Sequence, residues 1–272
     1  MSEVTTDVQD ELLQLRLKAL RLPGFLAHYA DLARRMIAEG WGPVEYLANL
    51  VEVEVNERAD RRLKRLLDDA KLPQGKTFAS LELERYPASL GAQIQELCRG
   101  EFPSEAINVY LAGNPGTGKS HVMAAIARAL VERGIPVLYI SVAALVERLL
   151  VAKRDLSMAR ELERLDRFEC LACDDIGYVK QDSAQMEVLF TLLSERYERK
   201  SLMVSSNLKF SEWDQIFKDP MTTAAAVDRF VHHSVMLEFN GPSYRANKAM
   251  ERAEAAKQAH EQRPRGGRKP QK

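Results

Sequence analysis

The feature that most constrains this chain is the segment GNPGTGKS, residues 113–120, which fits the pattern G-x-x-x-x-G-K-[ST] in full. An apolar run typical of a buried strand precedes it (107–113), and an amphipathic run typical of a helix follows it (119–133). The glycines allow successive N–H groups and the helix N-terminus to face a phosphate group. The motif therefore predicts a strand, a phosphate-binding loop and a helix.

This loop predicts binding of ATP and Mg²⁺. Lys119 would reach the β- and γ-phosphates, and the Ser120 hydroxyl would ligate Mg²⁺. The residues predicted to surround the phosphates are Gly113, Asn114, Pro115, Gly116, Thr117, Gly118, Lys119, Ser120 and His121.

The segment FECLACDD, residues 168–175, allows two interpretations. Cys170 and Cys173 have the spacing of half a zinc site or of a redox dithiol, whereas Asp174 and Asp175 end an apolar run as a metal-binding strand would. A structural zinc site needs four ligands, and the only other cysteine, Cys98, has no Cys or His beside it. We therefore predict that both cysteines are buried packing residues, that Asp174 orients the Mg²⁺ shell, and that Asp175 polarises water.

Other short apolar runs alternate with helical patterns downstream. Strands are predicted at 107–113, 136–141, 168–175, 201–207 and 234–239, with helices near 119–133, 141–164, 184–199 and 211–232. Such alternation favours an α/β fold with a mostly parallel five-stranded sheet covered on both faces.

The N-terminal part has a different pattern, with predicted helices at 11–22, 25–40 and 43–70 separated by Pro and Gly. We predict an N-terminal helical domain over 1–72 that binds DNA or a partner, a linker over 73–88, an ATPase domain over 89–244, and a basic, disordered tail over 245–272. The tail carries nine Lys and Arg against three Glu, although the whole chain has zero net charge. It is either a polyanion-binding arm or a solvated tail.

The composition limits the surroundings of the chain. Three cysteines in 272 residues are too few for a disulfide framework, and no apolar run approaches the roughly 18 residues that span a bilayer. We expect a cytoplasmic protein without membrane insertion. His232 and His233 would point about 100° apart on a helix, which favours packing or surface roles over a shared metal.

Taken together, several segments resemble the IstB/DnaC group of AAA+ ATPases, and most closely the IstB-type helper ATPases of insertion-sequence transposition. They are the phosphate-binding loop, the Asp174–Asp175 pair, SSN (205–207), VDRFVHHS (227–234) and GPSYR (241–245), with LRLPGF (20–25) near the N-terminus. Most AAA+ proteins have Asp-Glu where this chain has Asp-Asp. Because Asp is one methylene shorter than Glu, Asp175 would hold the attacking water less well and hydrolysis would be slower.

The resemblance implies further roles. Asn207 would contact the γ-phosphate or the attacking water, Arg229 would act as an arginine finger in the ATP site of a neighbouring subunit, and Arg245 would sense phosphate or contact DNA. The expected catalytic residues are therefore Lys119, Asp174, Asp175, Asn207 and Arg229.

Three basic regions are candidates for DNA contact. Arg58, Arg61, Arg62 and Arg65 share one broad face of a predicted helix, which could equally be a solvated face paired with local acidic residues. Lys153 with Arg154 is the second region and Lys180 the third.

The resemblance implies a helper ATPase that assembles into a homo-oligomeric ring or filament on duplex DNA, deforms the DNA, and regulates or recruits a partner transposase. The alternatives are a DnaC-like loader of a replicative helicase and an ATP-gated switch that does not hydrolyse ATP. Preference for duplex or single-stranded DNA separates the helper from the loader, and multiple-turnover phosphate release tests the switch.

Overall fold

A computed structural model describes residues 2–178, 183–209, 212–213, 220–244 and 250. The chain forms two compact units, residues 1–65 and 66–272. Among the described residues, no helix has the length and apolarity that crossing a membrane requires. The predicted Lys180 and Arg245, and all of the predicted tail except Met250, lie outside the described residues.

The first unit contains α1 (Ser2–Ala19), α2 (Pro23–Glu39) and most of α3 (Pro43–Ala70). Pro23 starts α2, where its missing N–H costs nothing, and Gly40 ends it in the left-handed conformation. At the start of α2, the carboxylate of Glu54 from α3 accepts hydrogen bonds from the N–H groups of Gly24 (2.6 Å) and Phe25 (3.3 Å). The conspicuous Pro-Gly pair thus allows α3 to approach the N-terminus of α2.

The second unit is built on a parallel five-stranded sheet in the order β2-β3-β4-β1-β5. The strands are β1 (Asn108–Gly113), β2 (Val137–Ser141), β3 (Cys170–Asp174), β4 (Ser201–Ser206) and β5 (Ser234–Phe239). All of the predicted strands are present, and the predicted mostly parallel sheet is confirmed.

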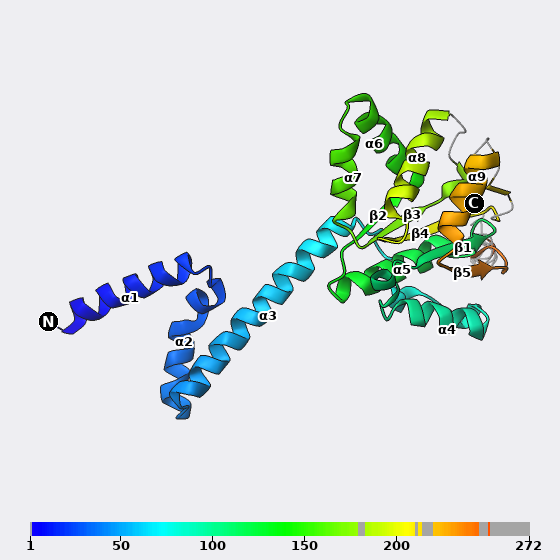
Figure 1. The fold of residues 1–272 in the computed structure, drawn as a ribbon. Coiled ribbons are helices and arrows are strands. Elements are labelled where there is room, and N and C mark those ends of the chain that lie inside the picture. The colour runs from blue at the N-terminus through cyan, green and yellow to red at the C-terminus, as the bar shows by residue number, and fades with distance from the viewer. Residues whose placement is uncertain (1, 179–182, 210–211, 214–219, 245–249, 251–272) are drawn as a thin grey trace, which may run out of the picture. The chain divides into compact units, whose positions relative to one another are not determined.

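Helices cover both faces of this sheet (Figure 1). Lying along one face are α4 (Ala88–Leu97) and α5 (Lys119–Glu132), and on the other are α6 (Val142–Arg154), α7 (Met158–Asp166), α8 (Ser183–Arg196) and α9 (Pro220–Val231). Short 3-10 helices occur at Phe78–Ser80, Leu83–Arg85, Phe102–Glu105 and Ile176–Tyr178. A cluster of buried apolar residues fills the space between the sheet and the second group of helices.

The helix predicted over 11–22 begins earlier, at Ser2, and ends at Ala19, and two further predicted helices differ in the structure. The single helix expected over 141–164 is divided into α6 and α7 by a turn, in which Leu156 has a φ of 50° and is 95% exposed. The helix expected over 211–232 ends at Val231, so His232 and His233 lie beyond it in a turn. The helical periodicity did not reveal either break, because neither contains Gly or Pro.

Candidate nucleotide site

The phosphate-binding loop connects β1 to α5 and is closely surrounded by other segments. Gly116 and Gly118 have φ values of 84° and 103°, and a Cβ atom would lie 2.2 Å from Ser243 Oγ and 2.2 Å from Tyr86 Oη, respectively. The glycines are therefore required by conformation and by space. Lys119 Nζ donates to the carbonyl oxygens of Gly113 (2.6 Å) and Asn114 (2.8 Å), which holds the cation against the loop.

Asp174, at the end of β3, is held by hydroxyl groups from three other elements. Ser120 of α5 and Ser205 of β4 donate to Asp174 Oδ1 at 2.8 Å and 2.5 Å, and Tyr139 of β2 donates to Oδ2 at 2.6 Å. Burial, together with the hydrogen bond to Asp174, raises the pKa of Tyr139, so its phenol stays protonated and donates. The carboxylate is oriented through both of its oxygens.

Asp175 follows with a different geometry. Its side chain is exposed, its φ is 67°, and its backbone N–H donates to Ser205 Oγ at 2.9 Å. The left-handed conformation is one that Asp and Asn tolerate better than most residues. This conformation makes the chain leave the direction of β3 after Asp174. Asp175 lines the same cleft as the phosphate-binding loop.

This cleft has a volume of about 590 Å³. It brings together the predicted Lys119, Ser120, Asp175 and Asn207, and Ser205 joins them from β4. The neighbouring Asp174 enters the same constellation through its bond to Ser120. Oxygen donors such as the Ser120 hydroxyl and the Asp174 carboxylate are what Mg²⁺ prefers, so these residues fit that ion.

A second pocket of about 370 Å³ adjoins the cleft, because Gly118, His121 and Tyr244 line both. Its apolar lining includes Leu81, Tyr86, Pro87, Leu90, Phe239 and Pro242. Much of this lining comes from the segment predicted as a linker, 73–88. Sequence reasoning missed these residues, because aromatic residues in a turn-rich segment give no sign of which distant loop they contact.

The segment before α4 is attached to the phosphate-binding loop by several contacts. His121 Nε2 lies 3.0 Å from Ser80 Oγ and 3.2 Å from the Thr77 carbonyl oxygen. Tyr86 Oη donates to the Thr117 carbonyl oxygen at 3.4 Å. The predicted His121 therefore contacts this segment as well as lining the cleft.

Arg229 is placed away from this cleft. It lies on α9, donates to the Ala225 carbonyl oxygen at 3.4 Å, and its guanidinium carbon is 4.9 Å from the ring centroid of Phe190 on α8. It is not among the residues that line the cleft of its own chain.

The basic residues predicted to contact DNA differ in their surroundings. Arg58 donates to Glu54 at 2.6 Å and to the Arg21 carbonyl oxygen at 2.7 Å, and Arg61 donates to Glu57 at 3.0 Å. The fold of the first unit thus already uses two members of this face. Arg62 and Arg65 are exposed on the same helix.

In the second unit, Lys153 Nζ pairs with Glu187 at 2.6 Å, and Arg154 Nε pairs with Asp155 at 2.9 Å. Both cations lie near the end of α6, beside the exposed Leu156.

The cysteines are packing residues. Cys170 and Cys173 are buried, and their three-residue separation along β3 places them on opposite faces of the sheet. Burial raises the pKa of each thiol to about 12, and that of Cys98 to about 11, so neither a thiolate ligand nor a reactive dithiol is favoured. Within the described ranges, no cysteine belongs to a cluster of potential metal ligands.

A parallel sheet, a phosphate-binding loop after β1 and an acidic pair at the end of β3 define a P-loop NTPase of the AAA+ class. Residues 15–252 match the model of the family described as IstB-like ATP binding protein, and the chain belongs to that family.

Relatives agree along most of the chain. An insertion-sequence ATP-binding protein of Sinorhizobium fredii is 41% identical over 252 residues, covering 92% of this chain and 85% of the relative. An ATP-binding protein of insertion sequence IS21 from Pseudomonas aeruginosa is 30% identical over 233 residues, covering 86% of this chain and 88% of the relative.

Solved structures support the fold. The DnaC helicase loader gives a TM-score of 0.51 at 18% identity, with 58% of this chain and 96% of that chain covered. DnaA from Aquifex aeolicus, bound to AMPPCP, gives a TM-score of 0.53 at 17% identity, with 73% of this chain and 58% of that chain covered.

Proposed function

We propose that this protein is an ATPase that assists transposition by assembling on duplex DNA, deforming it, and regulating or recruiting a partner transposase. One observation carries the enzymatic part: Lys119, Ser120, Asp175 and Asn207 line one cleft, and the carboxylate of Asp174 is oriented beside it. Membership of a family of ATP-binding proteins whose relatives belong to insertion sequences supports the transposition part.

Each residue of the cleft has a defined task in this proposal. The loop N–H groups and Lys119 bind the phosphates, and the adjoining apolar pocket, whose lining includes Tyr86 and Tyr244, accepts the adenine. Mg²⁺, held by Ser120 and Asp174, would neutralise charge on the phosphates. Asp175 orients water and accepts its proton, while Asn207 contacts the γ-phosphate or that water.

Arg229 serves another subunit in this proposal. Its position on α9, stacked on Phe190 and apart from its own cleft, suits a residue that enters a neighbour's site after assembly. Homo-oligomers in a ring or filament would then hydrolyse ATP faster than monomers.

The proposed domain division assigns DNA or partner binding to residues 1–72, with 73–88 as a connecting segment and 89–244 as the ATPase domain. The basic face of α3 is the first proposed DNA contact. Lys153 and Arg154 form a second contact on the ATPase domain, and their surface ion pairs are weak enough to exchange for phosphates. Smoothly bending 20–30 bp costs about 1–6 kcal/mol, which the summed contacts of several subunits could offset.

The test of the enzymatic part is multiple-turnover phosphate release by the full chain, with and without duplex DNA. We expect slow release that rises with DNA and with protein concentration, and none from Lys119→Ala. If no phosphate is released with or without duplex DNA at any protein concentration, the ATP-gated switch is correct instead.

The test of the DNA part is ATP-dependent binding to duplex and single-stranded DNA across a salt series. Arg62 and Arg65 are the residues to replace with Ala because both are exposed, whereas replacing Arg58 would remove the bonds to Glu54 and to the Arg21 carbonyl oxygen that hold α3 against the start of α2. The plot of log affinity against log salt has a negative slope. The magnitude of that slope should decrease by about 0.9 for each duplex phosphate that the variant no longer neutralises.

The matched control for this variant replaces Arg34 and Arg35, which pair with Asp31 and Glu39 on α2. It removes the same charge from the same unit and should leave the slope unchanged. Preference for single strands would favour the loader, and an unchanged slope for the Arg62 and Arg65 variant would place the DNA elsewhere.

A further inference from the structure

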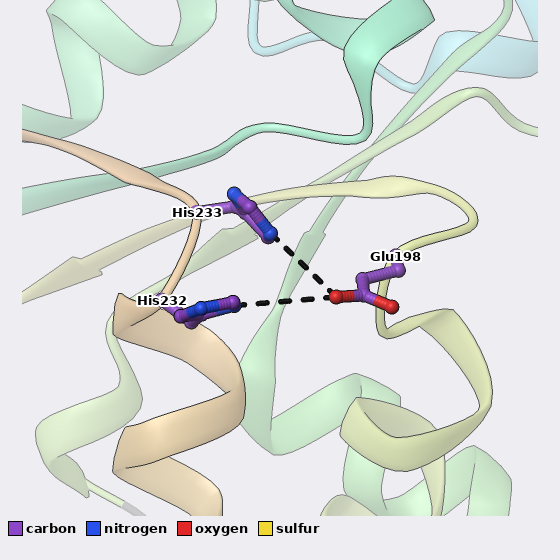
Figure 2. Close-up of side chains that lie close together, drawn as sticks. All are labelled: Glu198, His232 and His233. Carbon is purple, nitrogen blue, oxygen red and sulfur yellow. Dashed lines mark ion pairs between the residues drawn. The ribbon is translucent and has the colours of Figure 1, made fainter.

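Two histidines and a glutamate converge at the edge of the sheet opposite the nucleotide cleft. His233 directly precedes β5, and Glu198 lies in the turn before β4, so both are near the amino ends of parallel strands. The phosphate-binding loop follows the carboxyl end of β1. Figure 2 shows the side chains of Glu198, His232 and His233 pointing toward one another.

The turn after α9 makes this convergence possible. Adjacent residues on a helix could not present both rings to one ion, but α9 ends at Val231. The imidazole rings of His232 and His233 instead lie with centroids 4.2 Å apart and planes inclined by 62°. The helix geometry that favoured packing or surface roles over a shared metal therefore does not apply to these two residues.

The distances suit a small divalent cation. Glu198 Oε1 lies 3.6 Å from His233 Nε2 and 4.0 Å from His232 Nδ1. Around a tetrahedral Zn²⁺ with bonds of about 2.0–2.2 Å, ligand atoms stand about 3.4 Å apart. Small side-chain rotations would close this difference, and all three side chains are exposed and able to make them.

The backbone that carries these ligands is fixed, although the side chains are exposed. The His233 carbonyl oxygen accepts a hydrogen bond from the buried Asn108 N–H at 2.7 Å, and Asn108 Nδ2 donates to the Phe230 carbonyl oxygen at 3.2 Å. On the other side, the N–H of Lys200 donates to the carbonyl oxygen of Arg196, a buried residue. Glu198 itself has a φ of 56°, which turns its side chain out of the helical path.

One group competes for the site. Tyr197 Oη lies 3.2 Å from His232 Nδ1, which is the nitrogen that also lies 4.0 Å from Glu198. A bound ion would take the place of this hydroxyl as the partner of His232.

We propose that Glu198, His232 and His233 bind a transition-metal ion of the Zn²⁺ class. Two imidazoles and one carboxylate are ligands that Zn²⁺ and Co²⁺ accept, whereas Mg²⁺ prefers an all-oxygen shell. The ion joins the turn after α8 to the turn after α9 and so stabilises the packing of these two helices. This site is separate from the Mg²⁺ site proposed at Ser120 and Asp174, and it requires no nucleotide.

The experiment titrates untagged full-length protein with Co²⁺, without ATP, and follows the visible absorption of the ion and the unfolding temperature. We expect one saturable Co²⁺ per chain and an unfolding temperature that rises with Co²⁺. The variants His232→Ala/His233→Ala and Glu198→Gln should lose both effects, and because these side chains are exposed the variants should still fold.

Two control variants locate the site. His28→Ala removes a histidine that pairs with a single glutamate, Glu57, at 3.2 Å, and His260→Ala removes the histidine of the C-terminal tail. Both should bind Co²⁺ as the unmodified protein does. Equal Co²⁺ binding by the double-histidine variant and the unmodified protein would overturn the proposal, as would a lack of saturable binding by the unmodified protein.

Discussion

Tyr139 contributes to the nucleotide site through its hydroxyl group, which bonds the carboxylate of Asp174. Its hydroxyl donates to Asp174 Oδ2 at 2.6 Å, while Ser120 and Ser205 bond the other carboxylate oxygen. A hydrogen bond to a charged group contributes about 1.5–3 kcal/mol. We regard Tyr139 as a positioning residue that keeps the carboxylate aligned with the phosphate-binding loop.

We expect Tyr139→Phe to lower turnover by on the order of tenfold, because a misaligned carboxylate stabilises the transition state less. ATP affinity should change little, and the Mg²⁺ concentration that supports half-maximal turnover should rise. Steady-state phosphate release over a Mg²⁺ series measures both. The matched control is Tyr110→Phe, a buried tyrosine of β1 whose hydroxyl bonds Leu208 and Trp213 instead; if it lowers turnover equally, the effect is structural.

Asp175→Asn tests the residue proposed to accept the proton from water. Asn tolerates the left-handed φ of 67° as well as Asp does, so the fold and ATP binding should persist. Loss of a general base should reduce turnover by roughly 10²–10⁴-fold. Single-turnover hydrolysis with bound ATP is the measurement, and unchanged hydrolysis would assign the proton to another group.

At the scale of elements, the first unit depends on the close approach of α3 to the start of α2. A Cβ atom on Gly24 would lie 2.8 Å from Glu54 Oε2 and 3.0 Å from Glu54 Cα. We expect Gly24→Ala to destabilise this unit by about 1–3 kcal/mol, because the backbone must move. Chemical unfolding followed by helical circular dichroism measures the change, while ATP binding reports on the second unit.

The control for this substitution is Gly91→Ala in α4, where nothing lies within 4 Å of the added atom. Ala is favoured over Gly inside a helix by about 0.5–1 kcal/mol, so this variant should be neutral or more stable. Equal destabilisation by both substitutions would contradict the close-approach explanation.

The same approach of α3 to α2 makes the first unit sensitive to acid. Burial raises the pKa of Glu54, but hydrogen bonds from Arg58, Gly24 and Phe25 outweigh it and leave the pKa below its ordinary value of 4.5. The ionised form is therefore favoured by folding, so its contribution is present above 4.5 and is lost as the pH falls through the lower, folded pKa. Unfolding curves over an acid pH series should show this loss, and Glu54→Gln should be less stable at neutral pH with a flatter pH dependence.

At the scale of the whole molecule, the proposed reaction requires two chains. Arg229 stacks on Phe190 of its own subunit and does not line its own cleft. Arg229→Ala should leave ATP binding intact and lower turnover by about 10³–10⁵-fold, the range for removal of an arginine finger.

Mixing variants tests whether Arg229 acts between subunits. Lys119→Ala keeps the arginine but loses the phosphate site, whereas Arg229→Ala keeps the phosphate site. Mixed oligomers on duplex DNA should regain part of the turnover that neither variant shows alone. If phosphate release stays at the level of the separate variants while mixed oligomers form, Arg229 does not act in trans.

Local sequence patterns were sufficient for the nucleotide loop and the sheet. GNPGTGKS is contiguous, the strands are short apolar runs, and the carboxyl ends of parallel strands meet at one edge of a sheet. The sequence pattern placed Asp174 and Asp175 beside the loop, whereas Asn207 was assigned from the family resemblance. Helix ends were harder to predict: α6 and α9 stop at residues that have no distinctive propensity.

Only the tertiary structure decided which distant segments meet. Several residues between 80 and 90 line a pocket beside the loop, Arg58 bonds Glu54, and Glu198 reaches the histidine pair from another turn. Periodicity records which face of an element is apolar, and motifs record chemistry within a few residues. Contacts between residues that are tens of positions apart depend instead on how the helices pack on the sheet and on the direction that the chain takes after each turn. No local pattern encodes either.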